Sequence, residues 1–328
     1  MAKVLVSGKI HPAGMAVLEA EPDLEIEMIT DPGAALPIDK LAPADALLIR
    51  YGVLTAEQAA QMPKLRVVSR HGVGYDNLPV TELGARGIPV TIVGPVNAVS
   101  VAEQVFAMMM ALLKRIGPYD AAVRNGNWPI RDSLSVGELS GRRLLLLGFG
   151  RIGREVARRA SAFDMEVLVH DPFVDGGTVK SAGCTPVDDW RGALSETDVL
   201  SLHLPATEET LGIIGKSELA KMKPTTILIN AARGGLVDED ALCTALTGPM
   251  SQGGAGIDCF ADEPPASDLP LLGLPNVVLS PHSAALSAEA AQRMGVVAAR
   301  NVIDGLKGTL DHALIVNRKA LESVGHGL

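Results

Sequence analysis

The sequence has few cysteines, no excess of basic residues and no long apolar run, and each shortage excludes a class of protein. Its three cysteines, Cys184, Cys243 and Cys259, are odd in number and far apart. This spacing argues against a disulfide framework or a zinc site and fits reduced core or loop thiols in a cytoplasmic protein. No apolar run reaches the roughly 18 residues that cross a bilayer, so we expect no membrane partner. The N-terminal residues lack the apolar core of a signal peptide.

Basic residues are fewer than acidic residues. The chain has 29 Lys and Arg against 38 Asp and Glu, a formal net charge of −9. A nucleic-acid-binding surface needs basic patches to meet phosphates, so we expect no nucleic-acid partner. Apolar residues, in contrast, make up 47% of the 328 residues. That composition can fill the core of one large domain or two ordinary ones.

The chain is organised around a glycine motif that follows an apolar run. The run, residues 144–147, stops at Gly148, and Gly148, Gly150 and Gly153 have the spacing G-x-G-x-x-G. In such a motif the first glycine allows a tight turn and the second lets the backbone approach a pyrophosphate. The third lets the following helix pack closely on the sheet. The free N–H groups at the start of that helix then face the phosphates.

An acid stands at the expected distance beyond this motif. A second apolar run, residues 167–169, is followed by Asp171. A carboxylate at this place accepts hydrogen bonds from the 2′-hydroxyl of a ribose and repels a 2′-phosphate. The whole pattern predicts a dinucleotide site that favours NAD over NADP.

Short apolar strands alternate with helices along the chain. Strands are predicted over residues 3–6, 24–29, 46–49, 65–68, 88–92, 143–147, 166–170, 199–202, 226–230, 254–257 and 277–279. In the second half their apolar character without polar alternation fits parallel strands buried on both faces. A long apolar helix is predicted from Ser100 to about residue 116, with Ser100 and Glu103 as a capping box.

The last predicted helix, residues 287–306, is expected to cross back to the first unit. The predicted fold is therefore α/β, with two Rossmann-like domains, each a doubly wound parallel sheet. A discontinuous, flavodoxin-like substrate domain would comprise residues 1–97 plus 288–328. An inserted NAD-binding domain would comprise residues 98–287.

Three polar clusters follow predicted strands, where an open α/β sheet binds its ligands. They contain Arg233, Glu263 and His282. A histidine can move a proton near neutral pH, a carboxylate can stabilise its charged form, and an arginine can hold a substrate carboxylate through two parallel hydrogen bonds. Taken singly, each is more often a surface ion pair or a satisfied polar group. Together, downstream of a nucleotide motif, they favour catalysis.

With these clusters the sequence resembles the D-isomer-specific 2-hydroxyacid dehydrogenases, and it looks most similar to their phosphoglycerate dehydrogenase branch. The resemblance covers nearly the whole chain. Its motifs lie at residues 72–77, 148–153, 203–210, 230–238, 258–264 and 281–282.

The resemblance implies reversible hydride transfer between NAD(H) and a small 2-hydroxy or 2-oxo acid, without a metal. Arg233 matches the arginine that binds the substrate carboxylate and keto oxygen, His282 the general acid/base, and Glu263 its carboxylate partner. The implied cofactor residues are Gly148, Gly150, Arg151, Ile152, Gly153, Asp171, His203, Pro205, Thr210, Ala231 and Asp258.

The substrate is less sharply indicated. Val73 and Gly74 match the loop that holds the substrate carboxylate, and Arg50 and Arg70 each end a predicted strand. In the phosphoglycerate branch arginines at both places help to bind phosphate, and two arginines suit a second anionic group. Alternatively Arg50 pairs with an acid, and the enzyme is a hydroxypyruvate or glyoxylate reductase. His71 would add a hydrogen-bond donor to the substrate or narrow the substrate pocket.

Two further functions, known from other branches of this fold, stay open as alternatives. A non-catalytic, NAD-sensing corepressor-like protein would bind NADH without turnover, and a formate-oxidising enzyme would have a pocket without the extra arginines. The long apolar helix also favours a homodimer, because a monomer would leave its apolar faces exposed.

Overall fold

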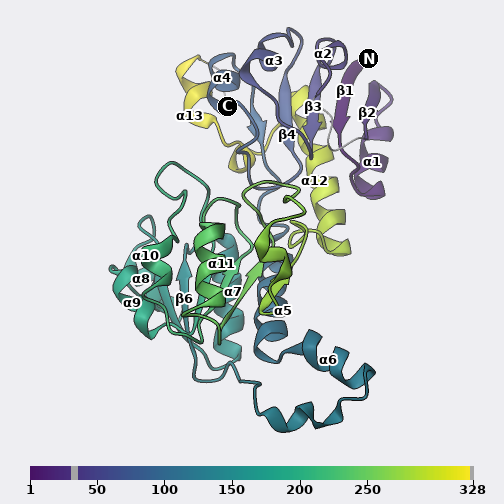
Figure 1. Cartoon of the computed structure of the whole chain (residues 1–328). Helices are drawn as coiled ribbons and strands as arrows, with labels where there is room; N and C mark the ends of the chain where they lie inside the picture. Colours follow the sequence, from purple (N-terminus) through teal and green to yellow (C-terminus); the bar gives the residue numbers. More distant parts are fainter. Residues whose placement is uncertain (31–35, 326–328) are drawn as a thin grey trace. The chain divides into compact units, whose positions relative to one another are not determined.

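The computed structural model describes residues 1–30 and 36–325, which form two compact units (Figure 1). One unit comprises Met1–Asn97 and Leu286–Leu328, and the other comprises Ala98–Ala285. The division falls next to the boundaries expected from the sequence, and residues 326–328 of the expected substrate domain lie outside the described residues. Within residues 1–30 and 36–325 no helix has both the length and the apolar character needed to span a membrane.

The first unit is built on a parallel sheet of five strands in the order β2-β1-β3-β4-β5. The strands are β1 (Ala2–Ser7), β2 (Leu24–Ile29), β3 (Ala46–Ile49), β4 (Val67–Arg70) and β5 (Val90–Thr91). Its helices are α1 (Pro12–Glu19), α2 (Ile38–Leu41), α3 (Ala56–Ala60), α4 (Val80–Ala85), α12 (Ala288–Lys307), η4 (His312–Leu314) and α13 (Arg318–Ser323). Helix α12 packs against α1, β3 and β4, so the end of the chain completes this unit.

The second unit has a parallel sheet of seven strands in the order β12-β11-β10-β9-β6-β7-β8. The strands are β6 (Arg143–Leu147), β7 (Glu166–His170), β8 (Thr185–Pro186), β9 (Val199–Leu202), β10 (Ile227–Asn230), β11 (Gly254–Ile257) and β12 (Val277–Leu279). Its helices are α5 (Ala98–Leu113), α6 (Ile116–Arg124), η1 (Trp128–Ser133), α7 (Arg151–Ala162), α8 (Gly176–Ser181), α9 (Trp190–Ala193), η2 (Leu194–Glu196), α10 (Lys216–Leu219), α11 (Glu239–Thr247) and η3 (Pro270–Gly273).

The central strand β6 explains why its sequence is apolar without alternation. Leu144 and Leu146 lie in the core on the face covered by α5 and α7, whereas Leu145 and Leu147 lie in the core on the opposite face. Since successive side chains of a strand point to opposite faces, a sheet buried on both sides needs apolar residues at every position. Two such parallel sheets confirm the predicted α/β fold with two Rossmann-like domains.

The predicted capping box at Ser100 is wrong. Helix α5 begins at Ala98, so Ser100 lies inside the first turn, and its hydroxyl donates to the carbonyl of Ala284 at 2.6 Å. The hydroxyl thus ties α5 to the loop after β12 instead of capping the helix. The long helix also ends at Leu113, where the chain turns through the left-handed residue Arg115 into α6.

Helices α1 and α12 cross where both carry a glycine. A Cβ atom on Gly14 would lie 2.6 Å from the backbone carbonyl carbon and oxygen of Gly295. We expect Gly14→Ala to lower the free energy of unfolding by about 1–3 kcal/mol, because backbone cannot move aside as a side chain can. Gly117→Ala is the matched control, since a Cβ there meets no described atom within 4 Å. Equal denaturation midpoints for the two variants would contradict this packing.

Candidate active site

The turn between β6 and α7 leaves one glycine facing open space. A Cβ on Gly148 would lie 2.4 Å from the carbonyl oxygen of His203, and one on Gly153 would lie 2.3 Å from that of Gly148. Gly150 caps α7, and a Cβ there would meet no atom of the described chain within 4 Å. Two of the three glycines are therefore required by the fold itself, whereas Gly150 leaves room for a phosphate at a helix N-terminus.

Asp171 is fixed beside this turn by two backbone donors. Its Oδ2 accepts a hydrogen bond from the N–H of Phe149 at 2.7 Å, and its Oδ1 accepts one from Phe173 at 2.9 Å. A carboxylate has about four acceptor sites, so two remain for the hydroxyls of a ribose. Arg151 and Ile152 form the first turn of α7. These residues fit the predicted binding of NAD.

The loop after β9 is held by its own side chains. The ring of His203 bonds through Nε2 to the Ser201 hydroxyl at 2.9 Å, and burial of the ring lowers its pKa to about 4. The hydroxyl of Thr210 donates to the carbonyl of Pro205 at 2.7 Å and accepts from the N–H of Thr207 at 2.8 Å. His203 and Thr210 therefore act on the shape of this loop.

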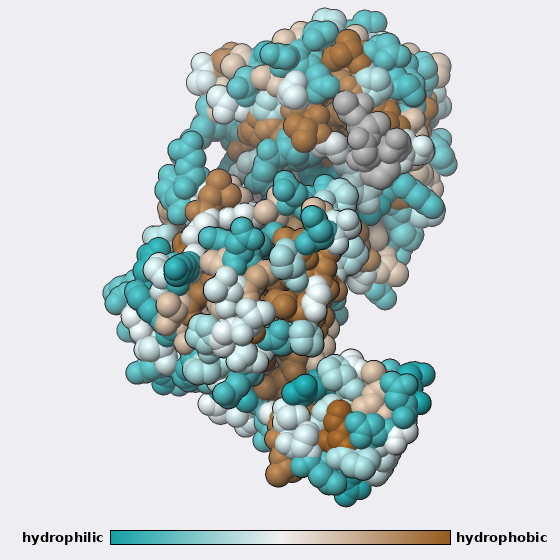
Figure 2. Space-filling model, viewed as in Figure 1, coloured by the Kyte–Doolittle hydropathy of each residue, from teal (hydrophilic) through white to brown (hydrophobic). Residues whose placement is uncertain are grey.

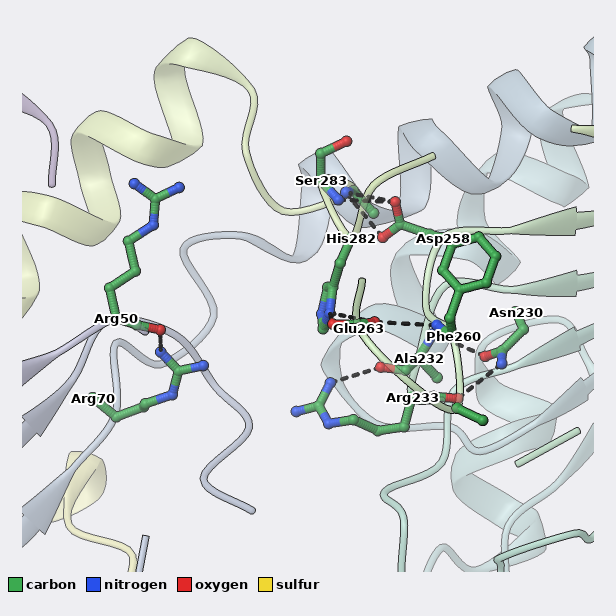
Figure 3. A network of polar contacts seen from close by, with 12 residues as sticks. Arg50, Arg70, Asn230, Ala232, Arg233, Asp258, Phe260, Glu263, His282 and Ser283 are labelled. Atoms are coloured by element: carbon green, nitrogen blue, oxygen red, sulfur yellow. Dashed lines mark hydrogen bonds and ion pairs between the residues drawn. The ribbon is translucent and has the colours of Figure 1, made fainter. Parts of the chain in front are cut away.

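The loop after β10 carries Ala231 and Arg233. Asn230, at the end of the strand, donates from Nδ2 to the carbonyl of Arg233 at 2.8 Å and accepts from the N–H of Ala232 at 3.2 Å. The Arg233 guanidinium donates to the carbonyl of Ala232 at 2.6 Å (Figure 3). Residue 234 must be glycine, because a Cβ there would overlap the carbonyl oxygen of Phe260 at 1.7 Å.

The buried carboxylate of Asp258 holds the loop after β12 (Figure 3). It accepts hydrogen bonds from the N–H groups of Ser283 and Ala284 at 2.9–3.2 Å. The carbonyl of Asp258 also accepts from the N–H of His282 at 2.7 Å. The resemblance assigns Asp258 to the cofactor, and this clamp on His282 is a role that the sequence did not predict. His282 itself adopts a left-handed backbone conformation, with φ of 50°.

His282 and Glu263 lie side by side, as Figure 3 shows. The Nδ1 atom of His282 lies 2.7 Å from Oε2 and 3.0 Å from Oε1 of Glu263, and Oε1 also accepts from the N–H of Phe260 at 3.1 Å. Burial opposes ionisation of Glu263, but the hydrogen bond and charge of His282, with the N–H of Phe260 and the charge of Arg233, outweigh it and hold the carboxyl pKa below its usual value.

This pair lines a pocket of about 440 Å³. The remaining lining residues are mostly apolar: Phe260, Pro264, Pro265, Leu272, Leu279, Ser280 and Pro281. Since Nδ1 of His282 faces the carboxylate, Nε2 is the ring nitrogen left for a ligand. The arrangement can move a proton between a ligand and the histidine.

In the first unit, Arg70 braces the loop that follows β4. Its Nε donates to the carbonyl of Gly74 at 2.9 Å, and its Nη1 donates to the carbonyl of Arg50 at 2.9 Å (Figure 3). The Arg50 guanidinium lies 4.6 Å from the ring centroid of Tyr51 and also donates to the carbonyl of Lys9. Arg70 thus shapes the loop that contains Val73 and Gly74. The binding of substrate by these residues stays a prediction.

His71 is buried beside these arginines, with 5% of its surface exposed. Neither ring nitrogen has a hydrogen-bond partner among the described residues. Burial, and then the charge of Arg50, lowers the pKa of His71 to about 4. The ring is therefore neutral at physiological pH.

This buried neutral ring predicts a loss of stability in acid. The unfolded chain binds a proton at His71 near pH 6.5, but the folded chain binds it only near pH 4. Stability is then complete above pH 6.5 and falls towards pH 4, by up to about 1.4 kcal/mol per pH unit. His71→Phe should flatten this dependence in urea unfolding experiments. Parallel curves for the two proteins would show that His71 does not contribute to it.

Comparisons with known proteins agree on one family. Residues 106–284 match the model described as D-isomer specific 2-hydroxyacid dehydrogenase, NAD binding domain. The D-3-phosphoglycerate dehydrogenase of Mycobacterium tuberculosis is 40% identical over 308 residues, covering 93% of this chain and 57% of that protein. This chain thus spans little more than half of that relative. The glyoxylate reductase of Korarchaeum cryptofilum is 37% identical, covering 95% of both proteins.

A solved structure supports the same assignment. The D-lactate dehydrogenase of Aquifex aeolicus, complexed with NAD and lactic acid, superposes with a TM-score of 0.86 at 31% identity, over 96% of this chain and 99% of that one. As the motifs predicted, this chain belongs to the D-isomer-specific 2-hydroxyacid dehydrogenase family and contains its NAD-binding domain.

Proposed function

We propose that this protein is an NAD-dependent D-2-hydroxyacid dehydrogenase. The observation that carries the proposal is the hydrogen-bonded pair of His282 and Glu263, at the same edge of one parallel sheet as the glycine turn and Asp171. Ligands of open α/β sheets bind at the carboxyl ends of the strands. Bound NADH would supply a hydride to C2 of a 2-oxo acid.

The side chains of this unit supply the remaining chemistry. In reduction, His282 donates the proton on Nε2 to the oxygen on C2, and in oxidation it takes the hydroxyl proton back. Glu263 accepts the hydrogen bond from Nδ1, which fixes the ring and stabilises its charged form. Arg233 would bind the substrate carboxylate and stabilise negative charge on the C2 oxygen.

Two substrate classes are supported by different observations. Arg50 and Arg70, together with the phosphoglycerate dehydrogenase relatives, favour a 2-hydroxy acid with a second anionic group such as 3-phosphoglycerate. One relative that matches over nearly its full length is a glyoxylate reductase, and Arg70 is already bonded to backbone carbonyls. These facts favour a hydroxypyruvate or glyoxylate reductase.

The experiment that tests the proposal is NADH oxidation with phosphohydroxypyruvate, sulfopyruvate, hydroxypyruvate, glyoxylate and pyruvate, with NADPH run beside it. We expect turnover with NADH and little with NADPH. If Arg50 binds a second anion, Arg50→Gln should raise KM for phosphohydroxypyruvate by about tenfold or more and leave KM for hydroxypyruvate unchanged, because a hydrogen bond to a charged group is lost. NADH binding without turnover would instead support an NAD-sensing, corepressor-like protein.

The proton-transfer role of His282 has its own test. His282→Gln should lower kcat by about 100-fold or more with the best substrate of that panel, since a positioned general acid contributes about 10²–10⁴-fold. Glu263→Gln should lower kcat less, because the amide can still accept a hydrogen bond from the ring. The matched control is His312→Gln, an exposed histidine of the other unit. Turnover of His282→Gln near that of the control would exclude the role.

We also propose that the protein is a homodimer. Helix α5, expected at the interface, has Met108 and Met109 buried in the core of its own unit. A group of exposed apolar side chains lies beyond it in the sequence, on α6, η1 and the residues that follow, where Figure 2 shows brown atoms among teal and white ones. They are Ile116, Val123, Trp128, Leu134 and Val136. Such a patch on one segment is typical of an interface.

The three free thiols also fit a cytoplasmic protein.

Charge on this patch should separate the protomers. Leu134 is 88% exposed and Val123 is 53% exposed, so replacing both with Glu should cost the protomer little. We expect V123E/L134E to elute as a monomer and the parent chain as a dimer in size exclusion with light scattering. A parent chain that is monomeric at micromolar concentration would contradict the proposal.

A further inference from the structure

Three side chains that bind metal ions meet at the proposed catalytic pair. One ligand atom each from Cys259, Glu263 and His282 lies within 4.8 Å of the other two. Cys259 and Glu263 come from the loop after β11, and His282 comes from the loop after β12. Because the ligands come from two loops, their spacing in the sequence does not resemble a metal motif.

We propose that these residues form a binding site for a thiophilic divalent cation, such as Zn²⁺ or Cd²⁺, and that the bound cation inhibits the enzyme. Sulfur, imidazole nitrogen and carboxylate oxygen are the ligands that such ions prefer. Tetrahedral zinc with ligand bonds of about 2.0–2.3 Å places its ligand atoms roughly 3.3–3.8 Å apart. The three atoms thus need to move by about an ångström or less, and a water would complete the coordination.

The surroundings of the cluster hold the ligands in place and leave one side open. The Asp258 carboxylate fixes the loop of His282, and the N–H of Phe260 fixes Oε1 of Glu263. The side chains of His282 and Glu263 are 46% and 39% exposed, whereas Cys259 is 2% exposed. A cation can therefore enter from the solvent side, between the histidine and the carboxylate, and meet the sulfur behind them.

The inhibitory half of this inference rests on the proposed function. A cation bonded to Nδ1 of His282 replaces the hydrogen bond to Glu263, and the Cys259 thiol loses its proton to solvent as the sulfur bonds the metal. The neutral ring then has its single proton on Nε2, which leaves that nitrogen without a lone pair, so the histidine no longer accepts a proton from a substrate hydroxyl. Oxidation of the 2-hydroxy acid should stop, while NADH binding should remain.

Cadmium is the probe for the site itself, because its bond to a thiolate gives a charge-transfer absorption in the ultraviolet that needs no turnover. The full chain, freed of metal with a chelator, is titrated with CdCl₂. We expect the band to saturate at one cadmium per chain. The same saturation is expected for C184A and C243A, the two matched controls, because neither of these cysteines belongs to a ligand cluster among the described residues.

Two non-thiol variants, C259A and C259V, should lack the band, and the retention of NADH binding shows that they are folded. His282→Gln should weaken cadmium binding by at least about tenfold, since loss of even an outer partner of a metal ligand costs roughly 10–100-fold in affinity. No band in the parent chain, or a band that persists without Cys259, would overturn the site. Cadmium binding without loss of 2-hydroxy acid oxidation would overturn the inhibition alone. Failure of the proposed function would leave the cadmium band unchanged.

Discussion

The buried carboxylate of Asp258 is the constraint on which the proposed chemistry depends. A buried carboxylate is costly unless it is hydrogen-bonded, and here two backbone N–H groups of the next loop donate to it. The same bonds force that loop to turn at His282, whose left-handed backbone then directs the ring to Glu263. An acid that is not itself an expected proton donor thus sets the geometry of the residue that is.

The turn between β6 and α7 is likewise held by contacts among its own candidate binding residues. Asp171 accepts from the N–H of Phe149, so the acid expected to bind a ribose also fixes the turn expected to bind the pyrophosphate. His203 contributes its backbone, against which Gly148 packs too closely for any side chain. The residues expected to bind the cofactor therefore hold one another in place before a ligand binds. This order reduces the conformational entropy that the protein loses on binding.

Most of the fold could be predicted from the sequence because both faces of the second sheet are buried. The strand β6 was predicted at its observed residues, since an unbroken apolar run between turn residues allows few alternatives. The start of α5 was predicted wrongly. Serine is a common N-cap residue, but the hydroxyl of Ser100 donates to the carbonyl of Ala284, which is far away in the sequence. A local pattern cannot show such a partner.

The sequence indicated residues for the candidate site but not their contacts. The resemblance of the motifs indicated Arg233, Glu263 and His282 as catalytic residues. From the hydrophobic periodicity alone, each would have been predicted to be a charged residue on the surface. The clamp by Asp258 and the position of Cys259 were missed, because both depend on how two loops meet. The bracing of a loop by Arg70 was missed for the same reason, since a sequence shows the charge of an arginine but not the carbonyls it bonds.

The most direct test of the account follows the hydride itself. NADH deuterated at both C4 positions is turned over with the best 2-oxo acid of the panel other than glyoxylate, whose product has no stereocentre, and the product is analysed by mass spectrometry and on a chiral column. The account predicts one deuterium on C2 of a D-2-hydroxy acid. A product without deuterium, or one with the L configuration, would contradict the assignment of this site to D-specific hydride transfer.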